Sequence, residues 1–483
     1  MTVSSEIQPN RNTPVKAGST SAQAASWPNP RRAWFGVVVL MACYATAFVD
    51  RQIITLLVEP IKQDLRINDT EFSLLSGLAF TLFYTVMGIP LAWAADRWSR
   101  QKLIMLGVAV WSAMTAACGM ANSFFTLFLA RIGVGIGEAG LSPAAYSMIA
   151  DSFPPARRAR AMGVYSIGAI AGVGLALMIG GAVVQWAVSS PPMTLPLIGT
   201  LKSWQLAFLI VSLPGPLLIF AMALVREPTR KDAAPEIDSP SQALLPFLRT
   251  QWAVLSLLTA GYSLLGVALA AYLVWTPAFL IRAHGWEIGQ VGVVFGSILL
   301  ICCSGGVLLG GWATDHLAKA GHKDGILRVA MFGGALCYPF AVAVPFAENS
   351  AMAVILLTLA CSAFGLFQGL PAATFLSVTP NRLRARVLAL YFLIGNLVAF
   401  TIGPTVAALI SDHWLKDPTK IGVAVGILCA VAIPLGVAAL AAARRPFILL
   451  VGAAESVEIN SARHSYKDAA GGIFRFRFGR PSR

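Results

Sequence analysis

Four ionisable side chains lie deep inside apolar stretches of this 483-residue chain. Asp50 and Arg51 are adjacent in one stretch, and Arg131 and Glu138 share another. Ionisable residues within a membrane-length apolar segment are energetically costly, so they mark candidate functional positions. Two acids and two bases cancel in formal charge, and the seven-residue spacing of Arg131 and Glu138 places both on one face of a helix. We therefore predict that these four residues form one charged cluster.

The chemistry available to such a cluster is proton exchange and anion binding. Burial favours the protonated form of a carboxyl group, whereas a neighbouring guanidinium favours the ionised form. Arginine remains charged in proteins, and its planar fork suits a phosphate or carboxylate. We predict proton coupling at Asp50 and Glu138, and binding of an anionic substrate group at Arg51 and Arg131. The alternative is a static ion-pair network that only joins two helices.

The second half of the chain has a different character. Between residues 252 and 443, no Asp, Glu, Lys or Arg lies in the middle of an apolar stretch. The substrate-binding candidates there are aromatic or neutral polar residues: Phe279, Phe364, Gln368, Tyr391 and Asn396. Ordinary helix packing is the alternative for each of them. A charged half that faces an apolar half suits a ligand with a polar head and an apolar tail.

The elements that must position these residues are transmembrane helices. Hydrophobic residues make up 57% of the chain and charged residues 12%, whereas soluble proteins carry about 25% charged residues. Apolar runs of about 20 residues can cross a bilayer, and they must be helical because lipid offers no hydrogen-bond partners to the backbone. Twelve such runs lie near residues 34–58, 72–95, 103–121, 124–150, 161–187, 204–225, 251–281, 288–313, 326–346, 351–379, 387–411 and 420–443. The predicted fold is an all-α membrane protein of twelve transmembrane helices.

The halves of the chain repeat each other, which predicts two six-helix bundles. The basic loop 155–160 precedes the fifth run and the similar loop 380–386 precedes the eleventh, while Asp96 after the second run corresponds to Asp315 after the eighth. Parallel six-helix repeats of this kind build transporters whose site lies between the halves. The predicted units are a disordered arm (1–32), an N-terminal bundle (33–225), a linker (226–249), a C-terminal bundle (250–443) and a tail (444–483).

Basic residues predict the orientation in the membrane. With the N-terminus inside, 28 Lys and Arg fall on the inner side and six on the outer side. Positive loops stay in the cytoplasm. We therefore expect a multi-pass protein of the inner (plasma) membrane with both termini in the cytoplasm, and we expect a monomer.

Several other classes of protein are disfavoured. The net charge of +14 is scattered among apolar runs rather than gathered on one soluble face, which argues against nucleic-acid binding. The seven cysteines lack metal-ligand spacing and the five histidines lie outside the runs, so we expect no metal and no cofactor. No Walker motif and no nucleophile–base pair is present, so we expect a transporter rather than an enzyme.

Local motifs resemble those of the major facilitator superfamily. The segment 92–102 (AWAADRWSRQK) is similar to the signature loop between helices 2 and 3 of that family, although Ala92 and Ser99 stand where glycine is usual. The segment 311–316 repeats part of it, and Arg131 with its following glycines resembles the basic motif of helix 4. The resemblance implies alternating access and a cytoplasmic gate that closes when the protein faces outward. The gate candidates are Asp96, Arg97, Arg100, Arg160 and Asp315, with Asp96 expected to accept hydrogen bonds from Arg100 or a nearby helix end.

Within that superfamily, the run 48–61 resembles the spinster-like branch, whose first helix carries an Asp-Arg pair, and Glu138 fits the same branch. The resemblance implies an amphiphilic, lipid-like substrate such as a lysophospholipid or sphingosine phosphate. Export of drug-like compounds and transport of an organic anion such as a sugar acid are the alternatives.

Overall fold

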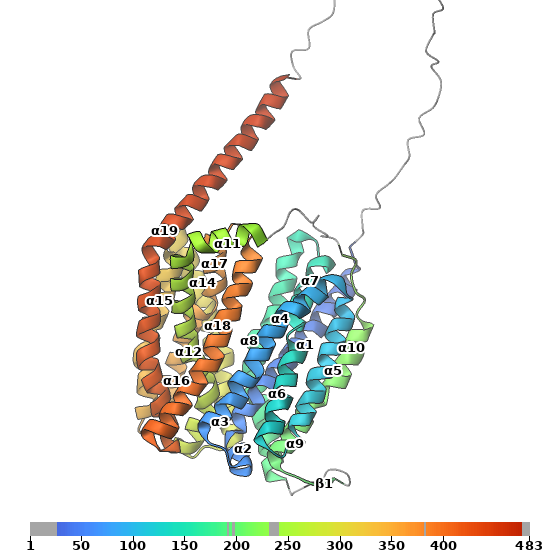
Figure 1. Cartoon of the computed structure of the whole chain (residues 1–483), viewed down its shortest axis with the longest axis vertical. Helices are drawn as coiled ribbons and strands as arrows, with labels where there is room; N and C mark the ends of the chain where they lie inside the picture. Colours follow the sequence, from blue (N-terminus) through green and yellow to red (C-terminus); the bar gives the residue numbers. More distant parts are fainter. Residues whose placement is uncertain (1–26, 191–192, 196–198, 231–240, 381–382, 476–483) are drawn as a thin grey trace, which may run out of the picture.

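Twelve helical stretches in the described part of the chain are long and apolar enough to cross a membrane. The computed structural model describes residues 27–190, 193–195, 199–230, 241–380 and 383–475, so the predicted arm lies almost wholly outside this part. The stretches form two bundles side by side (Figure 1). The all-α, two-bundle prediction is confirmed.

The N-terminal bundle contains six of the stretches. Its elements are α1 (Pro30–Leu56), α2 (Val58–Leu65), α3 (Asp69–Ser73), the π-helical turn η1 (Leu74–Leu78), α4 (Ala79–Arg97), α5 (Arg100–Cys118), α6 (Phe124–Glu138), α7 (Leu141–Ser152), α8 (Pro155–Ser189), α9 (Ser203–Ser212) and α10 (Pro214–Leu224). A short antiparallel hairpin, β1 (Met193–Leu195) and β2 (Gly199–Leu201), precedes α9. The fourth stretch is interrupted, because α6 ends at Glu138 and α7 begins at Leu141.

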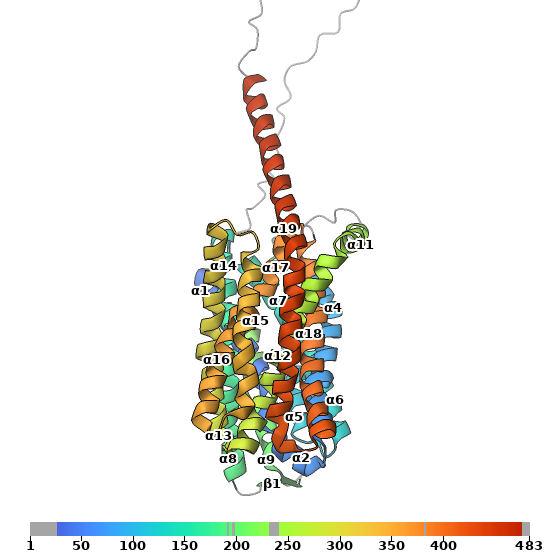
Figure 2. The ribbon, with the colours of Figure 1, turned by 90° about the vertical axis from the view of Figure 1, so that its left-hand side faces the viewer.

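The C-terminal bundle contains the other six stretches. Its elements are α11 (Ser241–Thr250), α12 (Trp252–His284), α13 (Ile288–Ser297), the π-helical η2 (Ile298–Cys303), α14 (Ser304–Lys319), α15 (Gly325–Ala343), the 3-10 turn η3 (Val344–Phe346), α16 (Ser350–Gln368), α17 (Leu370–Val378), α18 (Arg384–Leu409), η4 (Ile410–Leu415), η5 (Pro418–Lys420) and α19 (Ile421–Arg475). Part of the predicted linker is therefore the helix α11, which lies obliquely across one end of the bundle (Figures 1 and 2). Helix α19 continues through the predicted tail boundary at residue 443 and projects beyond the bundle.

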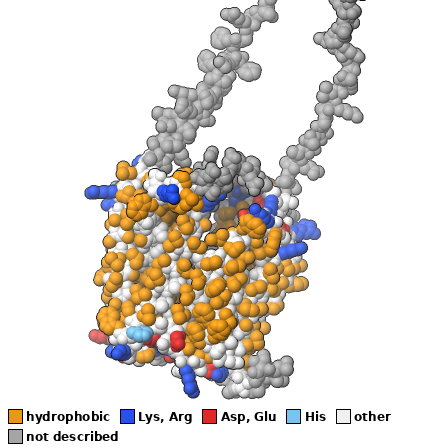
Figure 3. Space-filling view, viewed as in Figure 1, with side chains coloured by type: hydrophobic (Ala, Val, Ile, Leu, Met, Phe, Trp, Pro, Cys, Tyr) orange, Lys and Arg blue, Asp and Glu red, His pale blue; other side chains and the backbone are white. Residues whose placement is uncertain are grey.

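The surface has the band that a membrane requires. Apolar side chains cover the middle of the visible face, and Lys and Arg gather towards its two ends (Figure 3). Large apolar residues such as Leu308, Trp312 and Leu217 are more than half exposed on the outside of the bundles. Lipid tails are as apolar as these side chains, so their exposure costs no free energy in a membrane. The helices therefore need not bury every apolar face inside a bundle.

The two bundles meet through close helix contacts. In α8, Gly174 and Gly181 lie directly against Gly296 and Gly292 of α13, where a side chain on any of the four would meet the opposite helix. Small residues allow helix backbones to approach this closely in a membrane. These contacts form a glycine seam (Gly174, Gly181, Gly292 and Gly296) between the N-terminal and C-terminal bundles.

Ion pairs join the bundles at the end opposite the chain termini. Arg282, near the end of α12, donates to both carboxylate oxygens of Asp69 at 2.7 and 2.8 Å and to Glu59 at 2.6 Å. Asp412 of η4 accepts from the backbone and side chain of Thr70, both at 2.7 Å. We call this set of five residues the distal latch, since it closes the bundles together at the distal end.

Candidate functional site

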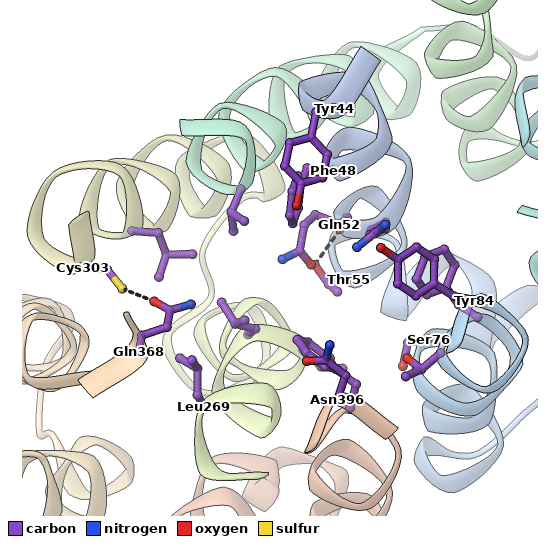
Figure 4. Close-up of a pocket in the computed structure, with 18 of the residues that line it drawn as sticks. Tyr44, Phe48, Gln52, Thr55, Ser76, Tyr84, Leu269, Cys303, Gln368 and Asn396 are labelled. Atoms are coloured by element: carbon purple, nitrogen blue, oxygen red, sulfur yellow. Dashed lines mark hydrogen bonds between the residues drawn. The ribbon is translucent and has the colours of Figure 1, made fainter. Parts of the chain in front are cut away.

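A cavity of about 460 Å³ lies between the bundles (Figure 4). Its N-terminal wall comes from Tyr44, Phe48, Arg51, Gln52, Thr55, Ser76, Phe80, Thr81, Tyr84, Arg131 and Val173. Its C-terminal wall comes from Leu269, Leu273, Val274, Leu299, Cys303, Ser304, Val307, Gln368, Gly369, Asn396 and Phe400. The volume falls within the range of small-molecule sites, roughly 300–1,000 Å³.

Arg51 of α1 stands on the cavity wall and is held from two directions. Its Nε donates to Oε2 of Glu138 at 2.6 Å. The rings of Phe48, Phe80 and Tyr84 surround its guanidinium, with centroids 5.1, 4.8 and 4.4 Å from Cζ. The Arg51 side chain is 21% exposed and that of Glu138 is fully buried. The guanidinium therefore faces the cavity and the carboxylate lies behind it.

Arg131 of α6 bridges three elements of the N-terminal bundle. Its Nη1 donates to the backbone carbonyl of Asp50 at 3.2 Å, and its Nε to the carbonyl of Leu75 in η1 at 3.5 Å. Its guanidinium also lies 5.3 Å from the ring of Phe80. The structure thus brings together the four residues of the predicted charged cluster, with Phe80 against both cations.

Each acid of the cluster has an oxygen without a protein donor. Asp50 and Glu138 are buried, and neither Oδ1 of Asp50 nor Oε1 of Glu138 accepts a hydrogen bond from any residue that the structure describes. Buried polar atoms are normally paired. Each carboxyl group therefore has one buried oxygen that no described group donates to. Neither acid lines the cavity, which is faced by Arg51 and Arg131 instead.

The opposite wall is mainly apolar, with two amides. Gln368 and Asn396, two of the candidate substrate-binding residues, line the cavity, and Oε1 of Gln368 accepts from the Cys303 thiol at 3.3 Å (Figure 4). The remaining side chains of this wall are aliphatic apart from Cys303, Ser304 and Phe400. A ligand in the cavity would meet cations on one side and hydrocarbon on the other.

Three predicted substrate-binding residues lie elsewhere. Phe279, Phe364 and Tyr391 are buried within the C-terminal bundle and do not line the cavity. Phe279 packs on His284, Phe364 on Tyr272, and Tyr391 stacks on Phe375 with centroids 4.4 Å apart. For these three aromatics, the alternative of ordinary helix packing matches their positions.

Most residues of the N-terminal wall were not predicted from the sequence. Tyr44, Phe48, Gln52 and Thr55 all lie on the face of α1 that carries Arg51 (Figure 4). Their spacing of three or four residues around a known intramembrane charge is a helical-face signal that could have found them. Phe80, Tyr84 and Ser76 come from a different stretch, so only the packing of the helices reveals them.

The predicted gate residues lie at the end of the molecule that carries the termini, but they do not form one contact. Asp96 and Asp315 are exposed, Arg97 covers the ring of Trp93 at 4.0 Å, and Arg160 lies 5.9 Å from the ring of Trp34. The expected hydrogen bond from Arg100 to Asp96 is not made among the described residues.

Arg100 instead anchors the start of the linker. Its side chain is buried and pairs with Asp151 of α7. Its backbone N–H and Nε donate to Glu227 at 2.9 and 3.1 Å, and Nη2 donates to the carbonyl of Pro228 at 2.9 Å. Ser99 also donates to Glu227. We call this set the linker anchor (Ser99, Arg100, Asp151, Glu227 and Pro228).

Two six-helix bundles around a central cavity form an architecture that membrane transporters build from a parallel repeat. The chain belongs to the Major Facilitator Superfamily, whose sequence profile matches residues 40–404.

Among known relatives, an "MFS-type efflux pump" of Mycolicibacterium smegmatis is 30% identical over 394 residues, 80% of this chain and 86% of that protein. "Protein spinster" of Drosophila melanogaster is 25% identical over 300 residues, 60% of this chain and 47% of that protein. A solved structure is also similar, a bacterial homolog of the human lysosomal transporter Spinster in an inward-facing, unoccupied conformation. It has a TM-score of 0.72 and 25% identity, and the match covers 88% of this chain and 98% of that one. The predicted spinster-like character is confirmed.

Proposed function

We propose that this protein is a proton-coupled secondary transporter that moves an amphiphilic anion, such as a lysophospholipid or sphingoid phosphate, by alternating access. The observation that carries the proposal is the Arg51–Glu138 ion pair at the wall of a cavity whose far side is mainly hydrocarbon. An anionic head at Arg51 and a tail along Leu269 and Leu273 would match both walls.

The ion pair supplies a route for coupling. Glu138 and an anionic headgroup compete for the same guanidinium, because the Arg51 side chain that pairs with Glu138 also lines the cavity. A proton on Glu138 removes its charge and weakens its hold on Arg51, which frees the guanidinium for the substrate. Proton binding and anion binding are then linked thermodynamically, as a coupled carrier requires.

The orientation follows the distribution of basic residues. We propose that both termini lie in the cytoplasm of a plasma membrane. The distal latch then lies on the outer side, and its Arg282–Asp69 and Thr70–Asp412 contacts hold that side closed. The cavity of this state would exchange its contents with the cytoplasm.

Transport in proteoliposomes tests the coupling. Asp50→Asn and Glu138→Gln should each reduce substrate uptake driven by a pH gradient, and the remaining uptake should depend less on pH. Glu348→Gln, an exposed acid outside both the cluster and the distal latch, is the control and should keep the wild-type pH profile. An unchanged pH profile in both cluster variants would overturn proton coupling at these residues.

A second candidate substrate class is favoured by the amides of the C-terminal wall. Gln368, Asn396 and Ser304 offer hydrogen bonds that a hydroxylated organic anion could use. A "Probable L-galactonate transporter" of Escherichia coli is 26% identical over 331 residues, 65% of this chain and 69% of that protein.

Thermal-shift measurements on the purified protein with lysophosphatidic acid, sphingosine phosphate and galactonate separate the two substrate classes. If the substrate is an amphiphile, lysophosphatidic acid and sphingosine phosphate should raise the unfolding temperature. The double variant Gln368→Leu/Asn396→Leu should keep this stabilisation. Stabilisation by galactonate alone, lost in that double variant, would favour the sugar acid.

A further inference from the structure

A second cavity, of about 550 Å³, opens at the end of the N-terminal bundle that carries the termini. It lies between the start of α1, the helix α7 and the segment that follows α10, and it shares no lining residue with the central cavity. Its lining includes Arg32, Val37, Leu40, Ile149, Arg226 and Glu227. The transport cycle proposed above uses none of them.

Two cations on this cavity have their guanidinium groups available. Arg32 and Arg226 are exposed, and neither side chain makes a hydrogen bond or ion pair with a described residue. The one acid in the lining, Glu227, is already held by Ser99 and Arg100 in the linker anchor, so its charge is matched. Two free guanidinium groups on one cavity offer the bidentate hydrogen bonds that phosphate oxygens prefer.

The rest of the lining suits a molecule that is apolar at its other end. Val37, Leu40 and Ile149 form a buried apolar floor. Phe35 and Leu224 are 43% and 59% exposed on the outer surfaces of α1 and α10. A ligand could therefore place a phosphate at the two arginines while its hydrocarbon continued over Phe35 and Leu224 into the bilayer.

We infer that this cavity binds the phosphate headgroup of an anionic membrane phospholipid. Basic pockets between transmembrane helices at the cytoplasmic surface recognise such headgroups, and the proposed orientation puts this cavity at that surface. This site is separate from the central cavity, so the inference does not depend on which substrate the protein transports. Because Glu227 and Pro228 belong both to this cavity and to the linker anchor, a bound lipid also stabilises the junction of the N-terminal bundle with the linker.

Lipid binding to the full-length protein in nanodiscs tests the inference. Native mass spectrometry and thermal unfolding are compared in phosphatidylcholine alone and in phosphatidylcholine with phosphatidylglycerol or cardiolipin. The wild type should retain anionic lipid and unfold at a higher temperature in its presence. Arg32→Gln/Arg226→Gln should weaken retention about thirtyfold, since each basic residue near an anionic surface contributes roughly a factor of five.

The matched control removes the same charge from the same end of the molecule. Arg31→Gln/Arg157→Gln replaces two exposed arginines outside the cavity lining and should behave as the wild type. An equal loss in both double variants would mean general surface electrostatics and would overturn the site. Equal stabilisation by glycerol phosphate in pure phosphatidylcholine would assign the cavity to a free anion and overturn the lipid. If the double variant fails to fold, Arg226→Gln alone carries the comparison, with Arg157→Gln as its control.

Discussion

At the scale of single residues, Phe80 determines how two cations can share one wall of the cavity. Its ring lies 4.8 Å from the guanidinium of Arg51 and 5.3 Å from that of Arg131, and it lines the cavity. The negative face of an aromatic ring attracts a cation, with about 2 kcal/mol gained where the pair is desolvated. Phe80 therefore orients both guanidinium groups before any anion arrives.

Phe80→Leu should weaken binding of an anionic substrate by about tenfold, equivalent to roughly 1.4 kcal/mol. Leucine keeps most of the volume and removes the ring face, so the two guanidinium groups lose a shared contact. Binding to the purified protein is measured by isothermal titration or by thermal shift. Phe400→Leu removes another ring from the cavity lining and should have little effect, because among the described residues no arginine lies over the ring of Phe400. Equal losses in the two variants would show that only apolar area matters.

The sequence identified the charged cluster but not its aromatic surroundings, for a physical reason. Asp50 and Glu138 stand out because ionisable groups in a membrane span have few structural uses. Aromatic residues pack well anywhere in a bundle, so Phe364 inside the core and Phe80 on the cavity look alike in a sequence. Only the docking of α4 against α1 and α6 separates them.

At the scale of elements, the linker anchor joins the start of the linker to α5 and α7. The sequence motif predicted a gate role for Arg100. Its contact with Glu227 could not be predicted, because the two residues are 127 positions apart in the sequence. Burial acts to raise the pKa of Glu227, but hydrogen bonds from Ser99 and Arg100 outweigh it and hold the pKa below its usual range. A carboxyl group with a lowered pKa in the folded state stabilises that state above its unfolded pKa, and this contribution is lost as the pH falls.

Glu227→Gln should therefore lower the apparent unfolding temperature most at neutral pH. As the pH falls below about 4.5, the ordinary pKa of glutamate, the unfolded chain takes up the proton first. The advantage of the wild type over the variant should therefore shrink until Glu227 is protonated in the folded state as well. Thermal unfolding at a fixed scan rate between neutral and acidic pH measures this difference. Glu348→Gln removes an exposed acid whose side chain makes no hydrogen bond or ion pair with a described residue and should leave the curve unchanged. A gap between wild type and Glu227→Gln that stays constant with pH would rule out a charge-dependent anchor.

At the scale of the whole molecule, the glycine seam and the distal latch set which end of the protein is closed. Arg282 reaches from the C-terminal bundle to Asp69 and Glu59, whereas the seam brings glycines of α8 directly against glycines of α13. The two bundles could be predicted from the sequence, because repeats and membrane spans are local signals. The glycine seam and the distal latch could not be predicted, since both depend on how the folded bundles pack together.

Gly181→Ala should open the distal end by wedging the bundles apart. A Cβ at this position would lie 2.9 Å from the Cα of Gly292 and 3.3 Å from the carbonyl oxygen of Ile288, so one helix backbone must move. Overpacking of this kind costs about 1–3 kcal/mol, which shifts a two-state equilibrium by roughly 5- to 150-fold. The change should favour the state in which the latch is broken and the seam is separated.

Spin labels at Met120 and Glu348, one at the distal end of each bundle, report this shift as a longer distance in double electron–electron resonance. Arg282→Gln should lengthen the same distance by a different route, since it leaves the latch carboxylates of Asp69 and Glu59 without their shared cation. Gly163→Ala is the control for the seam, because a Cβ there meets nothing within 4 Å although it lies in the same helix as Gly181. If Gly181→Ala left the distance unchanged while Arg282→Gln lengthened it, the seam would be a fixed pivot and the latch alone would decide the closed end.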